Sequence, residues 1–178
     1  MNYVVRGIKS DEWARLKELR LAALADPVAR IAFVDTHERQ IQEPDTRWQE
    51  RAAQGEAGEE LKTFVVEAGG DGPDGQPPLV AMAVVLVERD RAQTHLVGVY
   101  IRPEHRGTGL ARRLFDTALE WSWNLPEPRV ERVRLWVHED NARARGFYAK
   151  LGFTETGNTM AYPNQPRETE YELALARP

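Results

Sequence analysis

The sequence predicts a mixed α/β (α+β) fold in a single domain that spans residues 1–178. Three observations support this prediction. Helical and strand periods follow one another along the chain, a nine-residue apolar run is bounded by polar segments, and no repeat of about 20 to 50 residues is present. The composition, with 42% hydrophobic and 29% charged residues, is that of an ordinary globular protein.

The first third of the chain predicts one strand and two helices. The run Tyr3 to Ile8 is rich in β-branched residues and predicts a strand. Ser10 is the expected N-cap of a helix whose apolar residues recur at helical spacing, and this helix must end before Pro27. Asp45 is expected to cap a second helix.

The middle of the chain predicts a hairpin, a further strand and the clearest helix. Thr63 to Ala68 and the apolar run Leu79 to Val87 are strands joined by the glycine- and proline-rich loop GGDGPDGQPP. The second of these strands is apolar on both faces, which is typical of a central strand with helices on each side. His95 to Ile101 is the next strand, and Leu110 to Leu119 carries an apolar stripe at helical period.

The last third predicts strand, helix and two closing strands. Val133 to Val137 alternates as a strand, and Ala144 to Leu151 is a short helix that ends at Gly152. Phe153 to Gly157 and Glu168 to Ala174 are expected to complete the sheet. This order of elements favours a mixed sheet over a purely parallel one.

Composition excludes several classes of function. The chain contains no cysteine, which excludes disulfides, thiolate nucleophiles and zinc fingers. A net charge of −4 lacks the basic balance typical of nucleic-acid binding, so no nucleic-acid partner is expected. The longest apolar run has nine residues, whereas a bilayer span needs about 20. Without a secretory signal at the N-terminus, we expect a cytoplasmic protein with no membrane partner.

The stretch VYIRPEHRGTGLARRLF predicts an anion site. A strand leads through Pro103 to two glycines and directly into a helix, whose first amides lack intrahelical partners and carry the positive end of the helix dipole. Gly107 and Gly109 allow a phosphate to approach the backbone, and Arg106 adds a cation beside them. The spacing matches neither the Walker loop nor the dinucleotide-binding G-x-G-x-x-G motif. The alternative is that the two glycines only shape a turn and start the helix.

Two segments carry a family resemblance. The run Arg106, Gly107, Thr108, Gly109, Leu110, Ala111 resembles the acyl-CoA motif Arg/Gln-x-x-Gly-x-Gly/Ala of the GNAT superfamily of acyl-CoA-dependent N-acyltransferases. About thirty residues on, NARARGFYAKLGF resembles a second GNAT segment. The resemblance implies the GNAT fold, a mixed, mostly antiparallel sheet of roughly six to seven strands flanked by about four helices, bulged in strand 4 and splayed between strands 4 and 5.

The resemblance also implies an activity and a set of residues. The activity is direct transfer of an acetyl group from acetyl-CoA, as co-substrate, to a primary amine, with no metal. The amides of residues 106 to 111 would bind the pyrophosphate, and Val99 and Ile101 would pair with the pantetheine arm, which Asn141 would also contact. Tyr148 would be the general acid. His95 is our candidate for the general base, although relatives carry a Glu in that strand.

Several alternatives stay open at this point. Periodicity alone makes Tyr148 a core aromatic, and Asn141 is equally suited to be a helix N-cap. Glu88, His138 and Glu139 are other candidates for the base. The run HED at 138–140 is expected to be a solvated loop, because successive strand residues point in different directions.

The acceptor and the assembly are open as well. The resemblance implies that residues 25–45 and 157–167 face the acceptor, and their mixed charge does not identify it. The five tryptophans are expected in the core or at an interface. A homodimer is expected by resemblance. The competing functions are a non-catalytic acyl-CoA-binding regulatory domain and a site for another phosphate ligand.

Overall fold

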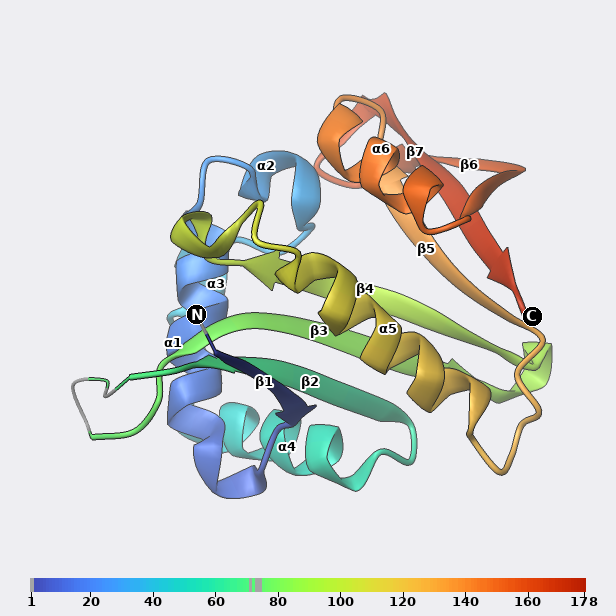
Figure 1. Cartoon of the computed structure of the whole chain (residues 1–178). Coiled ribbons are helices and arrows are strands. Elements are labelled where there is room, and N and C mark those ends of the chain that lie inside the picture. Colours follow the sequence, from blue (N-terminus) through green and yellow to red (C-terminus); the bar gives the residue numbers. More distant parts are fainter. Residues whose placement is uncertain (1, 71, 73–74) are drawn as a thin grey trace.

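A computed structural model describes residues 2–70, 72 and 75–178, and seven strands build one sheet (Figure 1). The strands are β1 Tyr3–Gly7, β2 Leu61–Ala68, β3 Leu79–Glu88, β4 Gln93–Ile101, β5 Arg132–His138, β6 Thr154–Tyr162 and β7 Gln165–Ala176. Their order in the sheet is β1-β2-β3-β4-β5-β7-β6. Every pair is antiparallel except β4–β5, so the predicted mixed, mostly antiparallel sheet is confirmed.

In the described part of the chain, four longer helices and two single turns of helix accompany the sheet. These elements are α1 Trp13–Ala25, α2 Ala29–Ala32, α3 His37–Gln40, α4 Asp45–Ala57, α5 Leu110–Trp123 and α6 Ala142–Lys150. Three short 3₁₀ turns are η1 Ser10–Glu12, η2 Arg89–Arg91 and η3 Pro103–His105. The turns α2 and α3 have four residues each, and so short a segment shows no helical period in the sequence. None of the described helices is long and apolar enough to span a bilayer.

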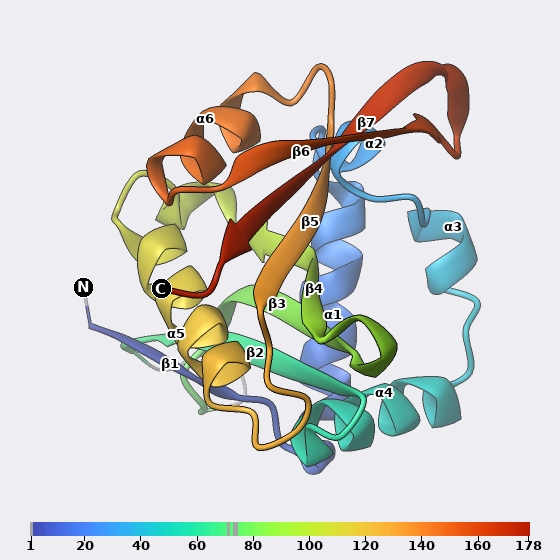
Figure 2. The same ribbon diagram turned by 90° about the vertical axis from the view of Figure 1, so that its right-hand side faces the viewer.

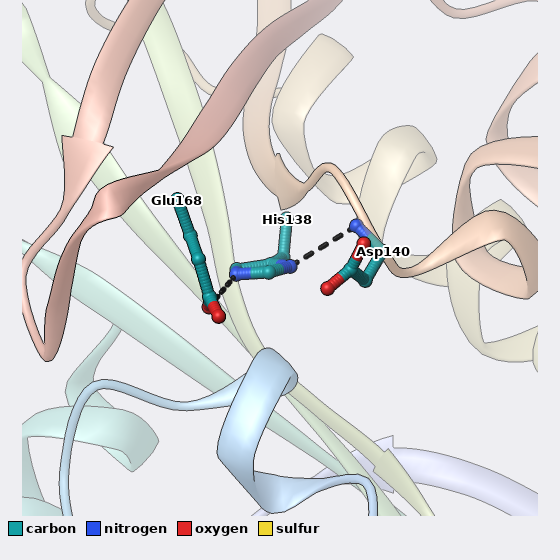
Figure 3. A group of neighbouring side chains, drawn as sticks. All are labelled: His138, Asp140 and Glu168. Carbon is teal, nitrogen blue, oxygen red and sulfur yellow. Dashed lines mark hydrogen bonds and ion pairs between the residues drawn. The ribbon is translucent and has the colours of Figure 1, made fainter.

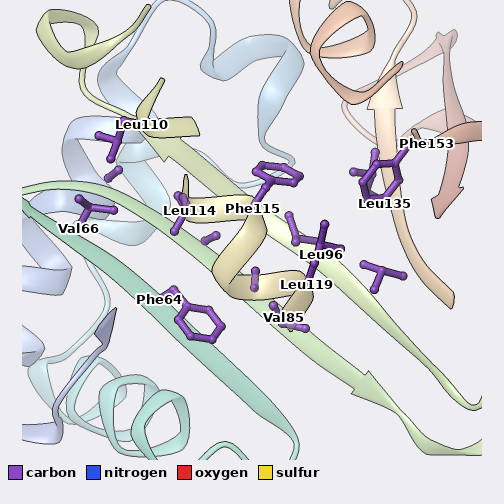
Figure 4. Packing of buried hydrophobic residues seen from close by; sticks show 14 of the residues in the cluster. Phe64, Val66, Val85, Leu96, Leu110, Leu114, Phe115, Leu119, Leu135 and Phe153 are labelled. Carbon is purple, nitrogen blue, oxygen red and sulfur yellow. The ribbon is translucent and has the colours of Figure 1, made fainter. Parts of the chain in front are cut away.

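Helices cover the sheet on both faces. On one face α5 inserts Leu114, Phe115 and Ala118 against β2, β3 and β4, and α6 packs on the same core (Figure 4). On the other face α1 and α4 bury Leu16, Leu19 and other apolar residues against Met82 and Tyr100. Figure 2 shows the two helix layers on either side of the sheet. The prediction that β3 is a central strand, buried on both faces, is confirmed.

The structure corrects two predicted helix caps and the length of the last strands. Ser10 lies inside the 3₁₀ turn η1, and the Glu12 carboxylate accepts the Lys9 amide at 3.0 Å in its place. Asp45 is the first residue of α4, after Pro44 as N-cap, and its carboxylate accepts a bond from Lys17 Nζ at 2.8 Å. The strands β6 and β7 both extend beyond the predicted segments, because their polar exposed faces conceal the strand period.

The strands β4 and β5 pair over only three positions. Gln93, Thr94 and His95 face Arg132, Val133 and Arg134, and beyond His95 the two strands diverge. On its other edge, β4 has a bulge against β3. Val97 pairs with Val84 and Tyr100 pairs with Met82, so between these pairs two residues of β4 lie opposite one residue of β3. The bulge includes Gly98, with a φ of +62°. The splay and the bulge implied by the family resemblance are therefore both present.

We predict that Gly98→Ala destabilises the protein by about 1 to 2 kcal/mol, because a Cβ is strained in the left-handed region that the bulge requires. Urea unfolding measures the loss. Gly146→Ala is the matched control, since Gly146 lies in α6, a Cβ there would meet no atom within 4 Å, and alanine should stabilise the helix. A stabilising Gly98→Ala would contradict this reading of the bulge.

Candidate active site

Two cavities meet where β4 and β5 separate. The larger, of about 540 Å³, lies between the β4–β5 gap and the helices α1, α3 and α4, and we call it the large cavity. The smaller, of about 380 Å³, lies between the loop of residues 105–109 and α6, and we call it the loop cavity. They share four lining residues, Ala32, Phe33, Val99 and Tyr148. Two reactants that enter from the two cavities would therefore meet beside Val99 and Tyr148.

The glycine loop presents its backbone to the loop cavity. Gly107 and Gly109 have φ angles of +78° and +82°, and a Cβ on either would meet no atom within 4 Å. The amides at the start of α5 thus border open space at the positive end of the helix dipole. Thr108 Oγ1 donates to the His105 carbonyl at 2.7 Å and fixes the turn. The Leu110 side chain is buried in the core, so only its backbone is available to a ligand.

Arg106 differs from expectation. Its Nε donates to the Ile101 carbonyl at 2.9 Å, and its Nη2 donates to the buried Asp26 carboxylate at 2.6 Å. The guanidinium therefore ties the glycine loop to the end of α1 instead of standing free beside the glycines. The exposed cations on the wall of the loop cavity are Arg112 and Arg143, which the sequence analysis missed.

The other predicted CoA contacts also border the loop cavity. Val99, Ile101, Ala111 and Asn141 all line it. Beyond His95, β4 has no strand partner on its β5 side among the described residues, so an extended ligand has an open edge to pair with. Asn141 is at the same time the N-cap of α6, where its Oδ1 accepts the Ala144 amide at 3.2 Å. The N-cap alternative for Asn141 is confirmed, and its contact with a ligand stays a prediction.

Tyr148 lies at the junction of the two cavities. Its ring packs near Phe115 and Phe153, at centroid distances of 5.6 and 6.1 Å, so the aromatic-core alternative describes one side of the residue. Its hydroxyl has no hydrogen-bond partner among the described residues. Burial raises the pKa of Tyr148 to about 12, which keeps the phenol protonated at neutral pH. A protonated hydroxyl at this junction is suited to donate a proton or a hydrogen bond.

His95 faces the large cavity at the base of the β4–β5 gap. Its Nδ1 lies 3.6 Å from Glu88 Oε1. Burial, followed by the nearby Arg134 charge, lowers the pKa of His95 to about 4, so the imidazole is neutral at pH 7 but is a weak base. Glu88, an alternative candidate, is hydrogen-bonded to Arg134, which lowers its pKa to about 2.

Glu170 is a site residue that the sequence analysis missed. It lies on β7, is 8% exposed and lines the large cavity. No described residue donates a hydrogen bond to its carboxylate or forms an ion pair with it, and burial raises its pKa above the usual carboxyl value. The sequence signal was the alternation Glu168, Glu170, Glu172, which places three carboxylates on one face of a strand.

The HED segment is not the solvated loop that we expected. His138 is 1% exposed, and its Nδ1 accepts the Asp140 amide at 3.1 Å, so Nε2 bears the proton and donates to Glu168 at 2.7 Å (Figure 3). His138, Asp140 and Glu168 bring their ligand atoms within 4.8 Å of one another. Both ring nitrogens already have protein partners, and Arg30 lies 3.2 Å from Glu168 and 3.8 Å from Asp140. The group is thus a hydrogen-bonded link between α2 and the last strands.

Glu139 has a structural role too. Its carboxylate accepts the Thr169 amide at 2.7 Å, which fastens the end of β5 to β7. Neither His138 nor Glu139 lines the two cavities. Of the alternative bases in the sequence, none borders the junction.

Comparison with known proteins identifies the family. The model of the acetyltransferase (GNAT) family matches residues 24–153, which is more than half of the chain. The chain belongs to the GNAT family. Within that match lie the glycine loop, the bulged β4 and Tyr148.

Sequence relatives are N-acetyltransferases that the chain matches in part. It is 35% identical over 97 residues to mycothiol acetyltransferase of Kineococcus radiotolerans, covering 54% of this chain and 29% of that protein. It is 29% identical over 99 residues to spermidine N(1)-acetyltransferase of Vibrio cholerae, covering 56% and 53%. The match therefore spans between about a third and a half of these relatives.

Solved structures agree with the fold over nearly the whole chain. The spermidine N-acetyltransferase of Vibrio cholerae, in complex with CoA and spermine, superposes with a TM-score of 0.72 at 18% identity, covering 98% of this chain and 95% of that one. A GNAT acetyltransferase of Streptococcus pneumoniae gives a TM-score of 0.77 at 17% identity, covering 99% and 100%. At this identity the likeness establishes the fold.

We predict that the Glu88–Arg134 pair stabilises the base of the site in a pH-dependent way. Because the folded-state pKa of Glu88 is lowered from 4.5 to about 2, its contribution is complete above pH 4.5 and is lost as the pH falls toward 2. Glu88→Gln should therefore lower the free energy of unfolding at pH 7 and lower it progressively less down to pH 3. Urea unfolding at several pH values tests this, with Glu120→Gln on the exposed face of α5 as control. A loss independent of pH would contradict the assignment.

Proposed function

We propose that residues 1–178 form one N-acetyltransferase domain that transfers the acetyl group of acetyl-CoA directly to a primary amine. The observation that supports this most strongly is the junction of the two cavities, which share Val99 and Tyr148 as walls. In this proposal acetyl-CoA occupies the loop cavity and the amine occupies the large cavity. A homodimer stays a prediction.

The proposed CoA site is built mainly from backbone. The amides of Gly107, Thr108, Gly109, Leu110 and Ala111 would bind the pyrophosphate at the start of α5. The amide of Arg106, which the sequence analysis included, donates to the Pro103 carbonyl at 3.2 Å. The arm would extend along the unpaired edge of β4 past Ile101 and Val99, with Asn141 on the facing wall. Arg143 is in place for the remaining phosphate charge. Arg112 binds Asp116 through Nε at 2.8 Å and has its other N–H groups left for a phosphate.

The reaction joins the amine nitrogen to the acetyl carbon and breaks the bond from that carbon to sulfur. Because both groups are held at the junction, the reaction no longer needs a bimolecular encounter, and this lowers the activation free energy by several kcal/mol. Tyr148 donates its proton to the leaving CoA thiolate. The backbone amide of Val99, at the bulge, is suited to stabilise the oxyanion that develops on the acetyl oxygen. The chain has no cysteine for an acyl-enzyme, so the transfer is direct.

For the general base we place Glu170 ahead of His95. The incoming ammonium must lose a proton, and a carboxylate whose pKa is raised by burial accepts it more readily than an imidazole with a pKa of about 4. Glu170 also has no other partner among the described residues, whereas His95 lies beside the Glu88–Arg134 pair.

We predict that Gly109→Glu abolishes acetyl-CoA binding, because it places a carboxylate and a side chain into the open space in front of the loop amides. Isothermal titration with acetyl-CoA, and with ATP as a competing phosphate ligand, measures the effect. Gly75→Glu is the control, since Gly75 has a similar φ of +72° and open surroundings far from the site. Equal affinity in both variants would refute the CoA site. Binding of acetyl-CoA without thiol release over a broad panel of amines would favour the non-catalytic regulatory domain.

We predict that Tyr148→Phe lowers kcat by about 10²-fold and changes the Kd for acetyl-CoA by less than about threefold, because the phenyl ring keeps the aromatic packing and lacks only the hydroxyl group that donates the proton. Thiol release under saturating substrates gives kcat, and titration gives Kd. Full activity of Tyr148→Phe would show that Tyr148 is not the general acid and only packs in the aromatic core.

We predict that kcat falls at acidic pH through a group whose pKa lies above the ordinary carboxyl value, since Glu170 must be ionised to accept a proton. Glu170→Gln should lower kcat by about 10²-fold and remove that limb of the pH profile. His95→Gln is the comparison. If His95→Gln removes the limb and Glu170→Gln leaves it in place, the base is His95.

A further inference from the structure

The large cavity contains hydrogen-bond donors without acceptors. Trp48 lies on α4, is 1% exposed and lines this cavity. Its indole Nε1 is buried and has no hydrogen-bond partner in the part of the chain that the structure describes. Buried N–H groups are usually hydrogen-bonded, so this donor is one that a ligand acceptor would satisfy.

Arg20 is a second unpaired donor on the same wall. It extends from α1 with its guanidinium carbon 4.6 Å above the ring of Phe33. No described residue accepts a hydrogen bond from it or forms an ion pair with it. Its Nη1 lies 3.8 Å from the position that a Cβ on Gly98 would take, which places the charge beside the bulge of β4. Burial lowers the pKa of Arg20 to about 10, and the guanidinium stays charged at neutral pH.

Arg51 is the third donor. It follows Trp48 by one helical turn, and its guanidinium carbon lies 4.7 Å from the centre of the Trp48 ring. A guanidinium has five N–H donors, and the side chain of Arg51 makes one hydrogen bond within the described residues, a long one of 3.4 Å to Gln40 Oε1. The remaining donors have no protein acceptor among those residues. Figure 2 shows α1 and α4, which supply the three donors, on the same side of the sheet.

The nearby carboxylates do not bind these donors. Asp35 also lines the large cavity, but it already accepts the Thr36 amide at 3.0 Å and Gln40 Nε2, and Arg39 lies 3.5 Å from it. Glu170 lines the same cavity and forms no ion pair with Arg20 or Arg51 among the described residues. The two guanidinium groups therefore keep donors for an anionic group on a ligand.

We propose that the acceptor amine carries a carboxylate, which binds between Arg20, Arg51 and the indole N–H of Trp48. The carboxylate fits because it is a planar acceptor that a guanidinium binds in a bidentate manner. Phe33, Val84 and Leu135 are among the apolar residues that line the same cavity. The acceptor class is therefore an apolar amino acid or a short peptide with a free carboxylate. This inference rests on the proposed transfer reaction.

The same residues disfavour a polyamine. Spermidine is the substrate in the names of several relatives, and it carries only positive charge. In this chain it would face Arg20 and Arg51, neither of which forms an ion pair with a described residue, and like charges that are both partly desolvated repel. A polyamine would also leave the Trp48 N–H unpaired, since a protonated amine has no acceptor.

The test compares acceptors that differ only at the carboxylate. Thiol release from acetyl-CoA is measured with phenylalanine, phenylalaninamide, phenethylamine and spermidine, and with leucine and leucyl-leucine beside their amides. Binding is measured in parallel by titrating the CoA-bound protein with N-acetylphenylalanine and with its amide. The carboxylates should exceed the matched amides by about 10- to 100-fold in kcat/KM and in affinity, the effect of a charge-assisted hydrogen bond.

Variants of Arg51 and Trp48 test whether these residues cause the preference for a carboxylate. Arg51→Met and Trp48→Phe should each reduce the preference for carboxylate over amide by about tenfold or more, mainly through KM, and both should retain the wild-type Kd for acetyl-CoA as evidence of folding. Arg47→Met is the matched control, because Arg47 lies one turn earlier on α4, is exposed and does not line the cavity. It should keep the full preference.

Two results would overturn the proposal. In the first, N-acetylphenylalanine binds no more tightly than its amide, and none of the acceptors with a carboxylate is preferred over its matched amide. The other is a preference that Arg47→Met reduces as strongly as Arg51→Met does. Failure of the transfer reaction is separate: carboxylate-selective binding without thiol release would support the anion site and refute the proposed enzyme.

Discussion

The active-site region depends on how the two halves of the sheet are joined. The strands β4 and β5 share only three residue pairs, and Arg134 strengthens this short contact from β5. Its Nε donates to Glu88 on β3 at 2.9 Å, and its Nη1 donates to Glu172 on β7 at 3.1 Å. The bond to Glu88 crosses from one half of the sheet to the other, and the bond to Glu172 fixes Arg134 within its own half. Above them the strands separate, and the two cavities open into the gap.

The other features of the site follow from this separation. Because β5 turns away, one edge of β4 is free beyond His95, and the bulge at Gly98 sets that edge against the cavities. The helix α6, carried after β5, then places Tyr148 in the gap from the far side. On the near side, the pair Asp26–Arg106 holds the glycine loop to the end of α1. Loop, bulge and phenol are thereby fixed relative to one another.

Much of the fold was readable from the sequence because its elements have strong periods. The apolar run of β3, the stripe of α5 and the glycine loop each produce a local signal that needs no tertiary information. The predicted caps at Ser10 and Asp45 were wrong because each residue is the first of its element: Lys9 and Pro44 occupy the N-cap positions, and the Lys9 amide is bound by Glu12 of the same turn. Glu170 was missed for a related reason. Nothing local distinguishes it from Glu168 and Glu172, whose carboxylates have partners, and only the packed structure shows which of the three is left without one among the described residues.

The central claim is that acetyl-CoA binds in the loop cavity with its thioester at the junction with the large cavity. A crystal structure of the complex with acetyl-CoA tests it most directly. We expect the pyrophosphate on the amides that follow Arg106, the arm along β4, and the acetyl group between Val99 and Tyr148. An acetyl group that ends away from Tyr148, or a pyrophosphate bound elsewhere than at the start of α5, would contradict it.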